Sequence, residues 1–184
     1  ENIKDNAYGY HKPIMIAGGI GYIKDKYAHK KKLHNNDVIV ILGGPSFRIG
    51  IGGGAASSMQ SGSSSEELDF ASVQRENAEL ERRCQEVISA CTYLDNNPIV
   101  SIHDIGAGGL CNAVPEIVND SQMGANILLD NVAVAESNMS SLEIWCNESQ
   151  ERYVLIIEKG DLETFKNICK RENCPLYVIG NVTK

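Results

Sequence analysis

A glycine-rich stretch at residues 43–58 is the part of the sequence best suited to binding an anion. It reads GGPSFRIGIGGGAASS, holds six of the 17 glycines and directly follows an apolar run at residues 38–42. Glycine adopts positive φ at little steric cost and lets backbone N–H groups approach a ligand closely. Because bare N–H groups suit an anion, usually phosphate, we predict a phosphate loop at Gly52, Gly53 and Gly54.

Two better-known loops fit this stretch poorly. A P-loop needs Gly-Lys-Ser/Thr after the glycines, and none follows. Residues 50–55 match the G-x-G-x-x-A dinucleotide pattern, but they begin about eight residues after the apolar run and lead into a serine-rich poor helix. A flexible loop without a ligand and a phosphate or substrate loop of another type both stay open.

A second candidate site follows the apolar run at residues 99–103, which predicts a short buried strand. Asp104 comes next, before three glycines and a predicted helix at residues 110–119. A carboxylate between a strand end and a helix N-terminus occupies the usual ligand position of open α/β sheets. Asp104 could instead cap the helix. We leave His103 out of the site, since such a residue is more often a satisfied strand-end side chain.

The elements that must position these residues are several short strands and two long helices. Apolar residues recur every three or four positions at residues 78–94 and again at 160–173, which predicts two amphipathic helices. Ser140 and Glu143 have the spacing of a capping box for a short helix. The pattern indicates an α+β fold with α/β-type layers, in which helices pack on a mixed sheet. Strands are predicted at residues 13–17, 37–42, 99–103, 125–129, 153–157 and 175–182.

Length, charge and cysteine spacing exclude several classes of protein. The 184 residues allow one large domain, or one domain and a piece of another. A net charge of −7 argues against nucleic-acid binding, and no apolar run reaches the roughly 18 residues of a membrane span. The chain begins at Glu1 without a signal pattern, so we expect a fragment of a cytoplasmic protein. None of the six cysteines has metal-knuckle or redox spacing, and we expect structural packing for each.

Four sequence blocks in order resemble one family. They read GGPSFRIGIGGGAASS, then LDFASVQR with ELERRCQEVI, then HDIGAGGL with PEIV, then LEIWCNESQERY. Together they look like phosphoribosylformylglycinamidine synthase, the amidotransferase of purine biosynthesis, in its long single-chain form with its own glutaminase domain. PIMIAGGIG near the start extends the resemblance to essentially the whole chain.

The resemblance implies a fold similar to the C-terminal domain of aminoimidazole ribonucleotide synthetase. In that family each half of the synthase has a barrel-forming domain followed by an α/β domain. The resemblance therefore implies that residues 1–42 are the end of the preceding barrel-forming domain and a linker, and that residues 43–184 are the α/β synthase domain.

The resemblance also implies a reaction. The family converts formylglycinamide ribonucleotide, ATP and glutamine-derived ammonia to formylglycinamidine ribonucleotide, ADP, phosphate and glutamate. ATP is expected to activate the formamide oxygen as an iminophosphate, which ammonia then displaces, with Mg²⁺ and oriented donors stabilising the charge. The partners implied are formylglycinamide ribonucleotide, ATP and the remaining synthase and glutaminase domains of a parent chain.

Residue by residue, the resemblance implies a partial site. Gln74 matches a substrate contact, Asp104 a magnesium ligand, and Glu148, Ser149 and Gln150 the family's substrate-contacting Glu-Ser-Gln. The catalytic histidine belongs to an upstream domain and the glutaminase cysteine to a downstream one, so we expect no catalytic residue here and no activity from the chain alone. Gln74 as a surface residue and Glu148–Gln150 as an exposed turn stay open.

Two other functions are compatible with the same blocks. The first is a non-catalytic, nucleotide-binding structural module of the same superfamily, because pseudo-repeated enzymes can keep a structural site beside an active one. The second is a relative that makes a different phosphoryl-transfer product, against which the Glu-Ser-Gln-Glu-Arg block argues.

Overall fold

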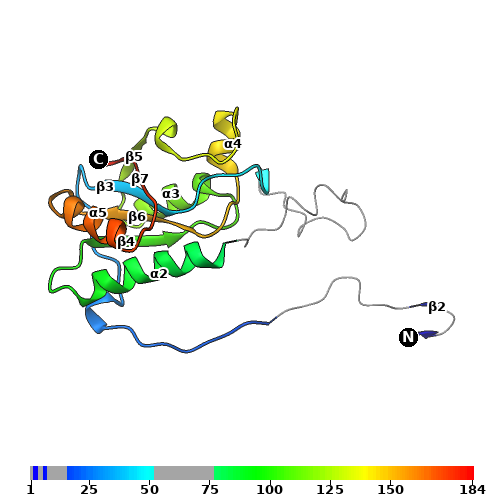
Figure 1. The fold of residues 1–184 in the computed structure, drawn as a ribbon, viewed down its shortest axis with the longest axis horizontal. Helices are drawn as coiled ribbons and strands as arrows, with labels where there is room; N and C mark the ends of the chain where they lie inside the picture. The colour runs from blue at the N-terminus through cyan, green and yellow to red at the C-terminus, as the bar shows by residue number, and fades with distance from the viewer. Residues whose placement is uncertain (1, 4–5, 8–15, 52–76) are drawn as a thin grey trace.

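The structure is a computed structural model that describes residues 2–3, 6–7, 16–51 and 77–184 (Figure 1). Gln74, the predicted phosphate loop at Gly52, Gly53 and Gly54, and most of the predicted strand at residues 13–17 lie outside the described residues. The two described residues of that strand, Ile16 and Ala17, are in no strand.

A five-stranded sheet forms the centre of the fold, with the strand order β4-β6-β3-β7-β5. All four strand pairings are antiparallel. The predicted α+β class is therefore confirmed, but the expectation of a mixed sheet is corrected. β6 lies between β3 and β4, and β7 between β3 and β5, so strands that share a direction are never paired with each other. The strands are β3 (Val38–Gly43), β4 (Ile99–Asp104), β5 (Gly124–Ile127), β6 (Arg152–Ile157) and β7 (Leu176–Thr183).

β3 is the middle strand, and all six of its residues are buried. Ile41, for example, lies opposite Val154 of β6 on one side and Tyr177 of β7 on the other. A continuous apolar run is typical of a strand covered on both faces. The assignment of residues 38–42 to a preceding domain therefore does not match the structure, which places them in the same sheet as the rest.

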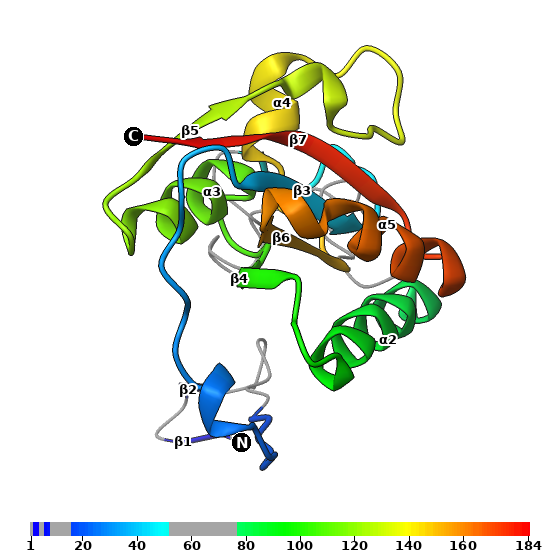
Figure 2. The same cartoon turned by 90° about the vertical axis from the view of Figure 1, so that its left-hand side faces the viewer.

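Helices cover both faces of the sheet, and Figure 2 shows the two layers. One face packs against α3 (Leu110–Asn119), with α4 (Ser141–Cys146) beside it. The other face packs against α2 (Ala78–Tyr93) and α5 (Leu162–Arg171). Successive residues of β3 alternate between the two cores, as the pleat of a strand requires.

Local signals set the helix boundaries. α2 begins after Asn77, whose side chain accepts a hydrogen bond from the Leu80 N–H at 3.0 Å. α4 has the predicted capping box between Ser140 and Glu143. α5 begins two residues later than predicted, because a 3₁₀ turn, η5 (Lys159–Asp161), comes first. The shorter elements are β1 (Asn2–Ile3), β2 (Asn6–Ala7), η1 (Asp25–Tyr27) and η4 (Leu129–Asn131).

The segment before the sheet reaches the core through Leu33, which is 3% exposed and packs with Ile39 and Ile41. Between residues 16 and 24 the chain has no regular structure and exposes Ile16, Ile20 and Tyr22 almost completely. Residues 29–32, one histidine followed by three lysines, are also exposed. Among them, Lys30 forms an ion pair with Asp120 at 2.6 Å.

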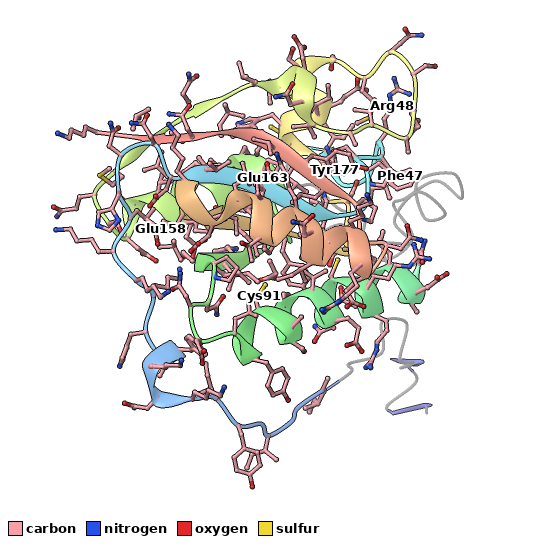
Figure 3. All side chains as sticks on the ribbon, turned by 60° about the vertical axis from the view of Figure 1, so that its left-hand side comes forward. Phe47, Arg48, Cys91, Glu158, Glu163 and Tyr177 are labelled. Atoms are coloured by element: carbon pink, nitrogen blue, oxygen red, sulfur yellow. The ribbon has the colours of Figure 1, made fainter. Side chains whose placement is uncertain are left out.

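All six cysteines are free, and four of them are buried between α2, α5 and the sheet. Figure 3 labels one of the four, Cys91 on α2. The sulfurs of Cys84 and Cys174 are 3.7 Å apart. Burial raises the pKa of the Cys91 and Cys169 thiols to about 12, which keeps both neutral. The predicted packing role is confirmed for these four. Among the described helices, none is long and apolar enough to cross a membrane.

Candidate functional site

A pocket of about 430 Å³ lies where β4 ends and β6 begins. Asp104, the last residue of β4, lies opposite Tyr153 of β6, and Gln150 comes two residues before β6. The structure thus brings Asp104 and Gln150 to one pocket. The lining residues are Ala78, Glu81, Asp104, Ile105, Gln150, Glu151, Arg152 and Tyr153.

The turn before β6 is anchored by Glu148, which is only 4% exposed. Its side-chain Oε1 accepts a hydrogen bond from the Gly108 N–H at 3.0 Å, and its own N–H donates to the Ile49 carbonyl at 2.7 Å. Glu148 therefore joins the described part of the glycine-rich stretch, residues 43–51, to the turn that follows β4; residues 43–51 are called the glycine-rich loop below. The alternative of an exposed turn does not hold for this residue.

Ser149 is also buried, and its hydroxyl forms hydrogen bonds with Phe47 and Asn147. It accepts a hydrogen bond from the Phe47 N–H at 2.8 Å and lies 2.7 Å from the side-chain oxygen of Asn147, to which it donates. Gln150 differs, since it is half-buried and its side-chain amide donates to the Glu148 carbonyl at 3.3 Å. Of the three residues in the Glu-Ser-Gln block, only Gln150 lines the pocket.

Two glycines make this close approach of loops possible. Gly109 has φ of 65°, and a Cβ there would overlap the carbonyl oxygen of Asn147. Gly50 has φ of 58°, and a Cβ there would overlap the carboxylate of Glu148. Positive φ and contact with neighbouring atoms both demand glycine at these positions.

Arg48 fastens the start of the glycine-rich loop to α4 and the segment before it (Figure 3). Its guanidinium forms ion pairs with Glu136 and Glu143, each at 2.9 Å. Hydrogen bonding to Glu143 and Glu136 raises the pKa of Arg48, while the Ser140 backbone N–H, the Ser140 hydroxyl and Arg48 lower that of Glu143. Sequence reasoning missed Arg48, although it is the only charged residue between positions 43 and 65.

Carboxylates give the pocket its polarity. The Tyr153 hydroxyl donates to Glu81 at 2.6 Å, and burial together with this bond raises the tyrosine pKa. Glu81, Asp104 and Glu151 all line the pocket. Within the described part of the chain, no group of three histidine, cysteine, aspartate or glutamate side chains is placed to hold a metal ion.

The imidazole ring of His103 contacts two other groups of the protein. Its Nδ1 lies 2.6 Å from the Asp104 carbonyl oxygen, and its Nε2 lies 3.1 Å from a carboxylate oxygen of Glu116 on α3. Both ring nitrogens thus have protein partners. This agrees with leaving His103 out of the candidate site.

The architecture is thus an α+β domain, with an antiparallel sheet covered by helices on both faces and a pocket at the end of β4. The chain belongs to the family described as AIR synthase related protein, C-terminal domain, which matches residues 35–184. The match begins before β3, in agreement with the position of that strand in the sheet.

Among individual relatives, the phosphoribosylformylglycinamidine synthase of Schizosaccharomyces pombe is 57% identical to this chain over 175 residues. That alignment covers 95% of this chain and 13% of the relative. The resemblance seen in the four sequence blocks is therefore confirmed, and the chain spans only a small part of this relative's length.

Solved structures agree with the fold. Thermotoga maritima PurL complexed with FGAR matches with a TM-score of 0.67 and 28% identity, over 84% of this chain and 25% of that one. Thiamine-monophosphate kinase from Stenotrophomonas maltophilia matches with a TM-score of 0.50 and 12% identity, over 84% of this chain and 49% of that one. At that identity the kinase supports the fold alone.

Proposed function

We propose that the chain is an α/β synthase domain of a long-chain phosphoribosylformylglycinamidine synthase. In this proposal it contributes substrate and Mg²⁺ contacts to the ATP-dependent amidation of formylglycinamide ribonucleotide. The observation that carries the proposal is the shared pocket of Asp104 and Gln150 in a chain 57% identical to such an enzyme. Solved PurL structures in complexes with FGAR and with ATP support the choice of ligands.

Gln150 is proposed to orient the substrate. Its side-chain amide offers two N–H donors and one carbonyl acceptor without charge. It can therefore hold a formamide or ribose group in one orientation, where a carboxylate would repel the phosphate of the substrate. The 3.3 Å hydrogen bond to the Glu148 carbonyl fixes the side chain at the edge of the pocket.

Glu148 and Ser149 are proposed to serve the same substrate by holding the turn that carries Gln150. Their polar side-chain atoms bond to Gly108, Phe47 and Asn147. Gln74 as a substrate contact, and Gly52, Gly53 and Gly54 as a phosphate loop, are proposed from their sequence positions, since they lie outside the described residues.

Asp104 is the residue proposed to hold Mg²⁺. Its side chain is 82% exposed at the pocket and offers only oxygen ligands, which suit this hard ion. The described residues contain no group of three histidine, cysteine, aspartate or glutamate side chains placed to hold a metal ion. The other ligands of the ion would therefore be phosphate oxygens or residues elsewhere in the parent protein. When bound, the ion would neutralise charge on the phosphoryl oxygens.

The remaining synthase and glutaminase domains are the proposed partners, and glutamine is the proposed amido donor. The chain alone would have no synthase activity, because these domains would supply the catalytic histidine and the ammonia. The proposed compartment is the cytoplasm.

Steady-state kinetics of the full-length parent test the proposal at Gln150. Loss of one or two hydrogen bonds to substrate is worth about 1–3 kcal/mol, so Gln150→Ala should lower kcat/KM for formylglycinamide ribonucleotide about ten- to hundredfold. Gln150→Glu should be worse, because it adds like charge. Asn167→Ala, an exposed position on α5, is the control and should behave as wild type.

The kinetic result also separates this proposal from a structural nucleotide-binding module. A folded Gln150→Ala enzyme with wild-type kinetics would count against a substrate role for this pocket. Turnover that depends on Gln150 would exclude a purely structural module.

A further inference from the structure

Arg152 is a charged side chain that neither the predicted site nor the proposed reaction uses. It is the first residue of β6, is 2% exposed and follows Glu151, whose φ is 59°. Burial lowers the pKa of Arg152 to about 10, so the guanidinium still carries its charge at neutral pH. Within the described residues, its guanidinium donates hydrogen bonds to neutral oxygens.

A buried charge of this kind is costly for folding alone. Taking a guanidinium out of water carries a large desolvation penalty, and an apolar side chain of similar volume would often fill the same space at least as well. Arginine is suited to one task that an apolar residue cannot perform, which is to bind several acceptors at once through its planar fork.

The fork of Arg152 joins two loops of the candidate site. Nε donates to the Ser149 carbonyl at 2.8 Å, and Nη2 donates to the side-chain oxygen of Asn147 at 2.6 Å. Nη1 donates to the Ser46 hydroxyl at 2.6 Å, at the start of the glycine-rich loop. The turn that carries Gln150 is thus held against that loop by one side chain.

The backbone of Arg152 reaches a third segment of the site. Its carbonyl accepts a hydrogen bond at 3.2 Å from the N–H of Ile105, the residue after Asp104. Arg152 therefore contacts all three segments that meet at this strand end, and it lines the pocket together with Gln150 and Asp104.

We propose that Arg152 is a positioning residue, which sets the distance between the glycine-rich loop and the Gln150 turn and so the shape of the substrate pocket. Because Arg152 is only 2% exposed, its guanidinium acts on the pocket through Ser46, Asn147 and Ser149. This inference rests on the proposed function for its kinetic consequence, but the loop contacts themselves are independent of the reaction.

The test uses Arg152→Lys in the full-length parent, with Arg82→Lys as the matched control. Lysine keeps the charge and loses the fork, whereas Arg82 is 75% exposed on its side chain and pairs only with Glu86 among the described residues. At a temperature where both variants are folded by circular dichroism, Arg152→Lys should raise KM for formylglycinamide ribonucleotide about tenfold or more. Arg82→Lys should leave KM within about twofold.

A double-mutant cycle shows whether Arg152 acts through the Gln150 turn. If it does, the total loss in the double variant Arg152→Lys/Gln150→Ala should be much smaller than the sum of the losses in the two single variants. Additive losses, or a folded Arg152→Lys enzyme with wild-type KM, would overturn the positioning role. A purely structural role would lower the folded fraction and kcat together while KM stayed unchanged.

Amide hydrogen exchange keeps the inference separate from the proposed function. Phe47 and Gly108 donate their N–H groups to Ser149 and Glu148, so both amides should exchange at least tenfold faster in Arg152→Lys than in Arg82→Lys. If the wild-type parent lacked synthase activity, this difference would still establish the loop contact, and unchanged exchange would refute it. Should Arg152→Lys fail to fold, Ser46→Ala removes a single acceptor and should show the same pattern more weakly.

Discussion

Gly109→Ala adds a single methyl group and should disrupt both the fold and the site. Gly109 is the N-cap of α3, with φ of 65° and ψ of −145°. Only glycine adopts this region without strain. The added Cβ would also overlap the Asn147 carbonyl oxygen and lie 2.9 Å from the Asn147 carbonyl carbon. The methyl group therefore meets a backbone that cannot rotate away as a side chain could.

Both effects contribute to the magnitude. The disfavoured backbone conformation costs about 1–3 kcal/mol. Overpacking against a fixed backbone costs about 1–3 kcal/mol more. We expect the free energy of unfolding to fall by about 2–6 kcal/mol, a large fraction of the roughly 5–15 kcal/mol of a typical domain. The Asn147–Gln150 turn should also shift away from the helix.

Gly106→Ala is the matched control in the same turn. The nearest atom to a Cβ there is a carboxylate oxygen of Asp104 at 3.8 Å, and Gly106 is not among the positive-φ glycines. Its effect on the free energy of unfolding should stay within about 1 kcal/mol. Urea unfolding followed by fluorescence of Trp145, the only tryptophan, compares the two variants. Equal midpoints with equal slopes would show that the clash with Asn147 is not what requires glycine.

Three further predictions concern a cap, the exposed carboxylate and two thiols. Ser140→Ala removes the capping box of α4 and should lower stability by about 1 kcal/mol in thermal unfolding. Asp104→Asn should leave thermal stability unchanged, because the side chain is 82% exposed, and should raise the Mg²⁺ concentration for half-maximal activity of the parent. The raised pKa of Cys91 and Cys169 stabilises the fold fully below pH 9.0, and this contribution should be lost as pH rises towards about 12. Unfolding curves measured across that range would detect the loss.

Each of these has a distinct contrary result. Unchanged melting of Ser140→Ala would mean that water replaces the cap without loss. If Asp104→Asn left the magnesium dependence unchanged, Asp104 would not be a ligand of Mg²⁺. Rapid alkylation of Cys91 or Cys169 in the folded chain at neutral pH would contradict their burial.

Elements with a strong local pattern could be predicted from the sequence. Cys84, Val87 and Cys91 recur at helical spacing and all three are buried on one face of α2. Ser140 and Glu143 form the capping box that their spacing indicates. The strand order could not be predicted, because the local sequence of β6 does not indicate that it pairs with both β3 and β4. The expected mixed sheet was wrong for that reason.

The same limit applies to the site. Asp104 could be predicted from its position after an apolar run and before glycines, and the structure places it at the pocket. The bond between Gly108 and Glu148 joins residues 40 positions apart, and the bond between Ser46 and Arg152 joins residues 106 apart. Such contacts have no local signal, so the burial of Glu148 and the fork of Arg152 were not predicted.

The position of β3 explains why the loops of the site belong to one unit. An apolar run such as residues 38–42 fits the last strand of one domain as well as the middle strand of the next. Both of its faces are covered, with Val40 and Leu42 in one core and Ile39 and Ile41 in the other. β3 also pairs along both of its edges, with β6 and with β7, so it lies inside the sheet and joins those two strands. The glycine-rich loop is therefore the exit of the central strand, and it begins next to the turn that Glu148 and Arg152 hold.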